Sequence, residues 1–460
     1  MNTDSVLAHI DASLDASRER WFEWLRIPSV SAQPVHAGDC VAAAEWLLGE
    51  LQGLGFEGGL HATPGHPVVI ATHPGPGGDA PHVLFYGHYD VQPAEPLELW
   101  NAAPFDPKMT DGPRGPRVVA RGAVDDKGQV MLWLEALRAW HGVTGTLPCR
   151  VTVLVEGEEE VGSPNLEPVL SARRADLAAD VCVISDTNSW DIDTPALTTR
   201  LRGLVYTQVT IKAANKDLHS GLFGGSAQNP INVLTKVLGA LRDETGRIQV
   251  PGFYDGVADV PAGIAAEWTA LGFDEAAFLG GVGLTAPAGE QGRSALERLW
   301  ARPTADVNGI WGGYQGAGAK TVIPAEASAK VSFRLVPGQD PAAVLAGYRA
   351  FVERLLPAGV RAEFDVFGVA PGVEIPADSR FVTAARAALA AEYGRPAVLM
   401  GSGGSIPVVE SMKRLLGLDS LLMGFGLEDD QVHSPNEKFE WRCFVHGVRS
   451  HARLLGALGG

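Results

Sequence analysis

Cysteine is scarce in this chain, which has only four cysteines among its 460 residues. They are Cys40, Cys149, Cys182 and Cys443, which lie far apart and form no C-x-x-C pair. This spacing excludes a disulfide framework and a thiolate zinc site. A reducing compartment, the cytoplasm, is therefore the expected location.

Positive charge is also in deficit, because 37 Lys and Arg residues face 54 Asp and Glu residues, for a formal net charge of −17. Nothing would offset phosphate repulsion, so we expect no nucleic-acid partner and no membrane partner. No apolar run approaches the roughly 20 residues of a membrane span. Residues 4–25 place charged and apolar residues at helical spacing and lack the basic start and apolar centre of a signal peptide, so they predict a surface helix.

What the chain does contain is enough apolar sequence, 46% of its residues, to fill a sizeable core. Its length predicts two domains, or one domain with a large insertion. Apolar runs of strand length occur at residues 83–86, 151–155 and 181–184, and residues 129–140 have helical spacing. This alternation predicts an α/β domain with a mainly parallel sheet.

A different pattern occupies residues 199–372. Residues 205–211 and 330–335 alternate apolar and polar side chains, which is typical of half-buried antiparallel strands, and residues 231–241 and 344–355 have helical spacing. We therefore expect a catalytic domain formed by residues 1–198 and 373–460, with an inserted α+β lid and dimerisation domain at residues 199–372. The Gly- and Ala-rich residues 255–318 have no clear assignment.

Five clusters of metal-binding side chains each follow a short apolar run. They are Gly87-His88-Tyr89-Asp90, Asp125-Asp126-Lys127-Gly128, Glu158-Glu159-Glu160, Ser185-Asp186 and His433-Ser434-Pro435-Asn436-Glu437. Ligands of such sheets bind beyond the carboxyl ends of the strands, so we expect these side chains to meet there. Imidazole and carboxylate groups without thiolates suit Zn²⁺, Mn²⁺ or Co²⁺, and a carboxylate can bridge two such ions.

Taken one at a time, these clusters are weak evidence, because a histidine near a strand end is usually an ordinary polar residue and three glutamates are usually a solvated acidic face. Together they resemble a known family, the dinuclear metallopeptidases and deacylases that include carnosinase, cytosolic non-specific dipeptidase, carboxypeptidase G, succinyl-diaminopimelate desuccinylase and acetylornithine deacetylase. The resemblance covers nearly the whole chain and is strongest to the carnosinase and non-specific dipeptidase branch. The matching segments lie at residues 87–93, 121–128, 159–163, 217–221 and 321–324.

The resemblance implies two divalent metal ions per subunit, with Zn²⁺ as the first expectation and Mn²⁺ or Co²⁺ as alternatives. By similarity, Asp125 would bridge the two ions, His88 and Asp186 would complete the ligands of one ion, and Glu160 and His433 those of the other. Asp126 would be a neighbour, joined to Asp125 by the cis peptide bond that family members carry.

The same resemblance implies roles for residues that bind no metal. Glu159 would be the general base, and Asp90 would accept the second ring N–H of His88. His219 from the partner subunit would stabilise the oxyanion, so a homodimer is expected. The remaining substrate contacts implied are Arg334, which would bind the terminal carboxylate, Thr321 and Ser405.

The function implied is metal-dependent hydrolysis of dipeptides by a metal-bridging hydroxide. An N-acyl amino acid deacylase or a carboxypeptidase would use the same site and is the alternative. Asp186 favours the dipeptidase side slightly, because carboxypeptidase-like members tend to have Glu there. A non-catalytic relative is disfavoured, because every ligand position and the base position are filled.

Overall fold

The computed structural model describes residues 3–404 and 406–459, and the chain forms two compact units. Unit 1 comprises Met1–Thr199, Ile375–Met400 and Ser411–Gly460, and unit 2 comprises Arg200–Glu374 and Gly401–Glu410. The first boundary between the units, after Thr199, lies one residue beyond the predicted boundary at residue 198. The second part of the predicted catalytic domain, residues 373–460, is interrupted by Gly401–Glu410, which belongs to unit 2. Gly401–Glu410 groups with unit 2 because it packs there: Gly401 lies against the Trp300 side chain, and the Gly403 carbonyl accepts a hydrogen bond from Arg202 at 3.1 Å.

The main sheet has nine strands, most of them in unit 1. They are β1 (Glu57–His61), β2 (Val68–His73), β3 (His82–His88), β6 (Arg150–Glu156), β7 (Val181–Ile184), β8 (Ala196–Leu201), β15 (Val373–Glu374), β16 (Val398–Ser402) and β17 (Ser420–Leu422). Their order is β1-β2-β6-β3-β7-β17-β8-β15, with β16 paired to β8.

This sheet is parallel at its centre and antiparallel at its flanks. Neighbours in the series β6-β3-β7-β17 are parallel, whereas β1, β2, β8 and β15 make antiparallel pairs. The predicted α/β class is confirmed, and the sheet as a whole is mixed. Every residue of β3 and β7 is buried, which explains why these strands read as continuous apolar runs.

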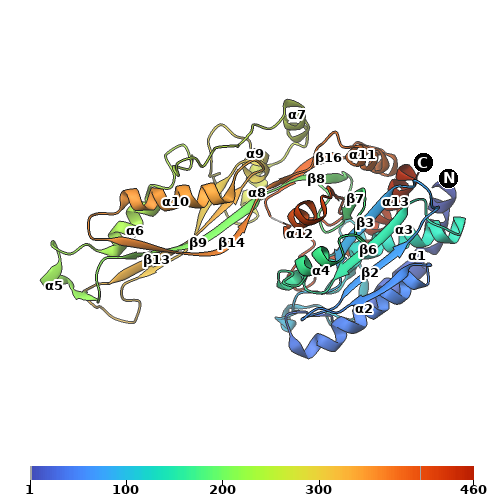
Figure 1. Ribbon diagram of the computed structural model, residues 1–460, viewed down its shortest axis with the longest axis horizontal. Helices are drawn as coiled ribbons and strands as arrows, with labels where there is room; N and C mark the ends of the chain where they lie inside the picture. The colour runs from blue at the N-terminus through green and yellow to red at the C-terminus, as the bar shows by residue number, and fades with distance from the viewer. Residues whose placement is uncertain (1–2, 405, 460) are drawn as a thin grey trace. The chain divides into compact units, whose positions relative to one another are not determined.

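Helices cover the main sheet. They are α1 (Thr3–Leu25), α2 (Ala37–Gln52), α3 (Lys127–Thr144), α4 (Leu166–Ala172), α11 (Arg380–Tyr393) and α13 (Trp441–Leu458). The predicted helices at residues 4–25 and 129–140 are confirmed as α1 and α3. Helix α3 contacts β3, α1 and α13 (Figure 1), and this surrounds it with protein, so it is apolar around nearly its whole circumference.

A small antiparallel sheet brings two distant segments of unit 1 together. Its strands are β4 (Lys108–Gly112), β5 (Gly115–Val119) and β18 (Lys438–Glu440), in the order β18-β5-β4. The loop after β5 contains Asp125, and the loop before β18 contains His433. Pairing of β18 with β5 therefore places these two loops side by side.

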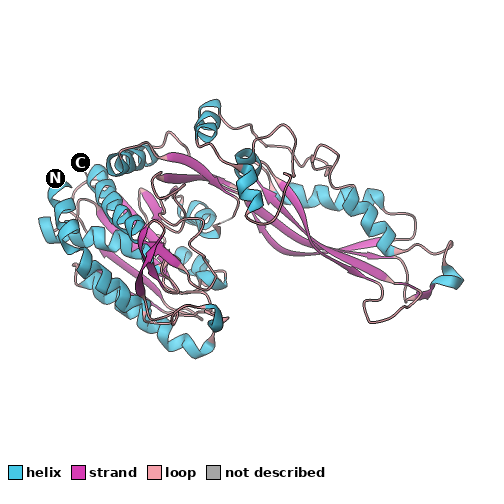
Figure 2. Cartoon of the chain, turned by 180° about the vertical axis from the view of Figure 1, so that it is seen from behind, coloured by secondary structure: helices cyan, strands magenta, loops and turns pink. Residues whose placement is uncertain are grey.

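Unit 2 is built on a four-stranded antiparallel sheet in the order β11-β13-β9-β14. The strands are β9 (Gly203–Lys212), β11 (Thr304–Gly312), β13 (Glu326–Leu335) and β14 (Arg361–Ala370), and the helices α6 (Pro230–Gly239) and α10 (Pro341–Leu355) pack on them. Figure 2 shows these long strands with helices along one face. The predicted alternation is confirmed, because Val209, Val331 and Phe333 lie in a core with Tyr348 of α10.

The stretch at residues 255–318 contains three short helices and a strand. These are α7 (Ala262–Ala270), α8 (Glu275–Gly280), α9 (Ala295–Trp300) and β11. The start of α9 has a local sequence cause, since Ser294 and Glu297 form a capping box. Within residues 3–404 and 406–459, no helix combines the length and apolar character that crossing a bilayer requires.

Candidate metal centre and active site

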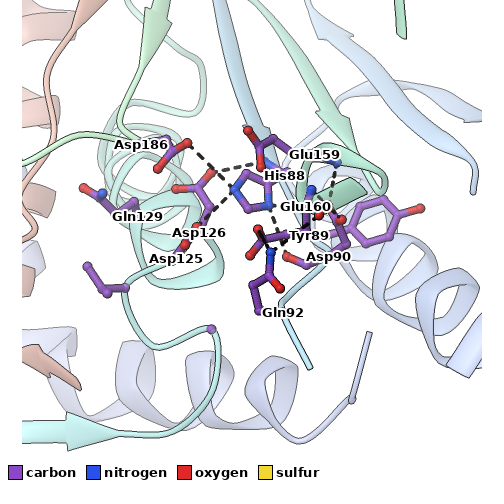
Figure 3. A network of polar contacts seen from close by, with 12 residues as sticks. His88, Tyr89, Asp90, Gln92, Asp125, Asp126, Gln129, Glu159, Glu160 and Asp186 are labelled. Atoms are coloured by element: carbon purple, nitrogen blue, oxygen red, sulfur yellow. Dashed lines mark hydrogen bonds and ion pairs between the residues drawn. The ribbon is translucent and has the colours of Figure 1, made fainter. Parts of the chain in front are cut away.

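Three neighbouring parallel strands deliver side chains to one edge of the main sheet. His88 is the last residue of β3, Asp186 follows β7 by two residues, and Glu159 and Glu160 lie in a 3₁₀ turn (Glu159–Val161) after β6. The carboxyl ends of parallel strands meet at the same edge, so these groups converge there. Figure 3 shows them pointing toward one another.

The remaining two predicted ligands come from the paired loops. Asp125 lies between β5 and α3, and the Asp125–Asp126 peptide bond is cis, as the resemblance implied. His433 lies before β18 in the left-handed backbone region, with φ of 61°, which a non-glycine residue rarely adopts. Asp126 stays outside the groups of candidate ligands, and its carboxylate accepts the backbone N–H of His88 at 3.1 Å.

The two oxygens of Asp125 face two different histidines. Oδ1 lies 3.2 Å from Nε2 of His88, and Oδ2 lies 3.0 Å from Nε2 of His433. The His433 nitrogen is also 3.3 Å from Oε2 of Glu160, and the His88 nitrogen is 3.9 Å from Oδ2 of Asp186. Two groups of candidate ligand atoms result, each lying within 4.8 Å of one another, and Asp125 belongs to both.

The chemistry of this cluster fits two divalent cations. Among the described residues, His88 Nε2 and Glu160 Oε1 are buried without a hydrogen-bond partner, although buried polar atoms normally have one. Both residues belong to the groups of candidate ligands, and imidazole nitrogen with carboxylate oxygen is a donor set that Zn²⁺, Mn²⁺ and Co²⁺ accept. The shared position of Asp125 is where a bridging carboxylate would lie.

Negative charge is concentrated around these groups. The carboxylates of Asp125 and Glu160 raise the pKa of His433 to about 10. Burial raises the pKa of Glu159, and the charges of Glu160 and Asp125 add to this effect while His88 opposes it. Burial also raises the pKa of Asp126 well above its usual value. So many buried carboxylates are stable together only when positive charge balances them.

Asp90 contacts the cluster through both its backbone carbonyl and its carboxylate. The ring nitrogen Nδ1 of His88 makes its hydrogen bond to the backbone carbonyl of Asp90, at 3.1 Å, and the Asp90 carboxylate is 3.4 Å away. That carboxylate also accepts the backbone N–H groups of Glu159 and Glu160, at 3.2 and 3.1 Å, and the hydroxyl of Ser31 at 2.6 Å. One residue therefore positions both the imidazole and the glutamate turn.

The roles of two supporting residues, Glu437 and Gln92, were not predicted from the sequence. Glu437 was part of the fifth cluster but had no predicted role, and Gln92 was only part of a matching segment. The carboxylate of Glu437 accepts the backbone N–H groups of Gly122, Val124 and Asp125 and pairs with Arg121 at 2.7 Å. The amide of Gln92 donates to Oε2 of Glu160 at 2.8 Å. Nothing in the spacing of these residues indicates such long-range contacts.

The predicted substrate contacts that the structure describes, His219, Thr321 and Arg334, belong to unit 2. His219 ends β10 (Leu218–His219) and its Nδ1 accepts the N–H of Gly221 at 3.0 Å, at the start of α5 (Ser220–Phe223). Thr321 is adjacent, because its carbonyl accepts the N–H of Ser220 at 3.1 Å. Arg334 lies on β13 opposite Thr304 of β11. Ser405 lies outside the described residues.

Two groups of imidazole and carboxylate ligands that have one aspartate in common, at the carboxyl ends of parallel strands, are characteristic of dinuclear metallohydrolases. The chain belongs to Peptidase family M20/M25/M40, whose model matches residues 84–457. It is 30% identical to Cys-Gly metallodipeptidase dug1 of Schizosaccharomyces pombe over 467 residues, which cover 98% of this chain and 97% of the relative.

Two solved structures share the fold at comparable identity. The human carnosine dipeptidase 1 structure has a TM-score of 0.77 and 28% identity, over 100% of this chain and 99% of that one. The M20 family metallo-carboxypeptidase Sso-CP2 of Sulfolobus solfataricus has a TM-score of 0.81 and 29% identity, over 96% of this chain and 99% of that one. The predicted membership of the carnosinase and dipeptidase branch is confirmed by these relatives.

Proposed function

We propose that this protein hydrolyses the peptide bond of dipeptides with two bound divalent metal ions. The observation that carries the proposal is the position of Asp125 between His88 and His433, in two ligand groups that share this residue. The names of the relatives from Schizosaccharomyces pombe and human support a dipeptide as the substrate class. The alternative is a carboxypeptidase or an N-acyl amino acid deacylase, and the Sulfolobus solfataricus structure favours the former.

In this proposal Asp125 would be shared by the two ions. His88 and Asp186 would hold one ion with it, and Glu160 and His433 would hold the other. Zn²⁺ is the first candidate for both positions, with Mn²⁺ and Co²⁺ as alternatives, because the donor set suits all three.

When bound, the ions supply the Lewis acidity that activates a water molecule and polarises the scissile carbonyl. Glu159 is next to a ligand but belongs to neither ligand group, so its carboxylate remains available for proton transfer. It takes a proton from the attacking water and gives it to the leaving amine. Asp90 acts as a positioning residue, because its carboxylate binds the N–H groups of Glu159 and Glu160 and its carbonyl accepts from His88.

Residues of unit 2 recognise the substrate. Arg334 binds the terminal carboxylate, for which a planar guanidinium with paired donors is suited, and Thr321 and Ser405 make further contacts. His219 from the partner subunit of a homodimer donates to the developing oxyanion. The four cysteines are free, buried thiols, which supports a reducing, cytoplasmic location.

The experiment that tests the function is a substrate panel with identification of the products. The purified protein is reconstituted with Zn²⁺, Mn²⁺ or Co²⁺ and incubated with dipeptides, tripeptides, longer peptides and N-acetyl amino acids. Dipeptide cleavage with a kcat/KM that clearly exceeds that for the other classes is expected. Cleavage of N-acetyl amino acids alone, or removal of carboxyl-terminal residues from longer peptides alone, would replace the dipeptidase proposal with the corresponding alternative.

A further inference from the structure

A cavity of about 500 Å³ lies within unit 2. Its floor is the sheet face opposite α6 and α10: Ser332 and Arg334 of β13 line it together with Thr304 and Asp306, the residues opposite them on β11. Its roof comes from α8 and α9, in the stretch that the sequence left unassigned. The sheet face opposite α6 and α10 is therefore covered at this end.

The arginines that line this cavity outnumber the acidic residues. Five arginines and three carboxylates are present. Each carboxylate pairs with an arginine of the cavity wall: Asp306 with Arg242 at 2.8 Å, Glu290 with Arg302 through two hydrogen bonds of 2.7 and 2.8 Å, and Glu275 with Arg298. Glu290 also lies 3.5 Å from Arg247, which does not line the cavity. Within each of these three pairs the positive and negative charges cancel. Two arginines of the cavity wall remain without a carboxylate partner among the residues that the structure describes.

The two remaining arginines are Arg202 and Arg334. Neither makes an ion pair with a carboxylate anywhere in residues 3–404 or 406–459. Arg202 precedes β9, and its Nε donates to the carbonyl of Gly403 at 3.1 Å. Burial lowers the pKa of Arg202 to about 10, and the neighbouring charge of Arg334 contributes, so the Arg202 guanidinium is still charged at neutral pH. Two like charges beside one cavity, in a chain of net charge −17, favour an anionic ligand.

The rest of the cavity wall limits the kind of anion. Ile248, Phe278, Leu279 and Leu299 line it, so an aliphatic body would be buried there, whereas a compact inorganic ion would leave most of the space empty. The volume is in the range of about 300 to 1,000 Å³ typical of small-molecule sites. Guanidinium groups bind carboxylates through paired hydrogen bonds.

We infer that this cavity is a binding site for a small organic anion with two carboxylates, one recognised by Arg334 and the other by Arg202. Two sources have this chemistry: the acidic carboxyl-terminal residue of a peptide, and a free dicarboxylic acid. The inference rests on the proposed function only for the peptide source.

Titration calorimetry on the metal-loaded protein tests the site directly. Glutarate is compared with pentanoate, which has the same number of carbons and one carboxylate. Glutarate should bind more tightly, and Arg202→Gln should weaken its binding by about tenfold or more, because hydrogen bonds to charged groups are among the stronger ones. Ser332→Asp, which keeps both arginines but adds a negative charge to the cavity floor, should have the same effect.

Arg349→Gln is the matched control, because it removes the same positive charge from a residue of α10 that does not line the cavity. It should bind glutarate as the wild type does. Equal binding of glutarate and pentanoate, or unchanged glutarate binding in both Arg202→Gln and Ser332→Asp, would overturn the inference, because the metals would then be the only carboxylate site.

Hydrolysis of Ala-Glu and Ala-Gln distinguishes the two sources. A higher kcat/KM for Ala-Glu that disappears in Arg202→Gln identifies the peptide terminus as the ligand. Equal hydrolysis of both peptides, with glutarate binding that depends on Arg202, identifies a free dicarboxylate. Hydrolysis of Ala-Ala tests the proposed function separately. If the protein hydrolyses Ala-Ala but neither binds glutarate nor prefers Ala-Glu, the inference about the cavity is wrong and the proposed function stands.

Discussion

The carboxylate of Glu437 accepts the backbone N–H of Asp125 at 3.1 Å. The same carboxylate accepts the N–H groups of Gly122 and Val124 and pairs with the buried guanidinium of Arg121. Both partners of this ion pair have side chains that are at most 1% exposed. The conformation of the loop that presents Asp125 therefore depends on a residue more than 300 positions away.

We expect Glu437→Gln to lower both stability and metal affinity. The amide leaves Arg121 as an uncompensated buried charge, which costs about 3–5 kcal/mol, and loss of support behind a ligand weakens metal binding about 10- to 100-fold. Urea unfolding and metal titration measure the two effects. Glu353→Gln, on the exposed side of α10, is the control and should change neither; an unaltered metal affinity in Glu437→Gln would contradict the positioning role.

Glu159→Gln should retain both metal ions and lose at least about 10²-fold in kcat, because general acid–base catalysis contributes that much. Metal content by mass spectrometry and steady-state kinetics on a dipeptide check the two parts. Glu158→Gln makes the same change one residue earlier, at a side chain that accepts a hydrogen bond from Asn165, and should keep its activity within a few-fold. Comparable activity of the two variants would remove Glu159 from its proposed role.

Chelation of the metal ions should lower the melting temperature as well as abolish hydrolysis. Without cations, the clustered carboxylates of Asp125, Asp126 and Asp186 repel one another, and ligand linkage alone is worth about 2.7 kcal/mol at a free metal concentration of 100 Kd. Differential scanning calorimetry with and without a chelator measures the shift. Re-addition of Zn²⁺ should restore it, and an identical transition in both conditions would argue against the clustered site.

A mixture of two inactive variants tests the shared active site. His219→Ala lacks the proposed oxyanion donor and Glu159→Gln lacks the base, so a heterodimer has one site with both defects and one site with neither. We expect activity to return toward one quarter of the wild-type value after subunit exchange, since about half of randomly paired dimers are mixed. Exchange demonstrated by mass spectrometry without recovery of activity would place His219 in its own subunit or outside catalysis.

The pair of Arg20 on α1 and Glu135 on α3 predicts how stability depends on pH. Burial alone would raise the pKa of Glu135, but the two hydrogen bonds from Arg20 and one from Ser17 keep it below its usual value. The carboxylate therefore stabilises the fold above the pKa it has in the unfolded chain, about 4.3, and this contribution is lost as the pH falls through the lower folded pKa.

Glu135→Gln should accordingly cost about 2–3 kcal/mol at pH 7, a value reduced from that of a fully buried pair because Arg20 is partly exposed. Urea unfolding at pH 7 and at pH 3 should show the difference from the wild type shrinking at the lower pH. Glu19→Gln, on the exposed side of α1, should stay within about 0.5 kcal/mol of the wild type at both values. If the difference in unfolding free energy between the wild type and Glu135→Gln became larger at pH 3 than at pH 7, the predicted direction of the pH dependence would be wrong.

The elements that the sequence predicted well are those whose burial is uniform along the element. Strands β3, β6 and β7 are buried on both faces and α3 is enclosed by protein, so each has an apolar pattern of its own. Three of the five clusters, those with His88, Glu159 and Asp186, were predictable for the same reason, because each lies at or just after the end of such a strand. The short helices at residues 255–318 were not predictable from periodicity, since helices of a few turns obtain their stability from tertiary packing.

The supporting contacts were beyond sequence analysis for another reason. Glu437 and Asp125, or Arg202 and Gly403, are joined across hundreds of residues, and no local pattern records such a pair. The surplus charge of Arg202 and Arg334 emerges only after every neighbouring carboxylate has been matched with its own arginine. For Asp90, the sequence spacing indicates that the residue lies near His88, but it does not show that the backbone carbonyl contacts the imidazole as well as the carboxylate.

The Gly401–Glu410 segment has a consequence for dissecting the protein. Because it belongs to unit 2 while its neighbours in sequence belong to unit 1, the polypeptide passes between the units at Thr199, Glu374, Met400 and Glu410. A gene fragment encoding residues 200–374 alone would lack the Gly403 carbonyl that binds Arg202. Unit 2 is thus not a module that can be excised or transplanted as one uninterrupted polypeptide, and any minimal version must supply the missing decapeptide in trans or through a new linker.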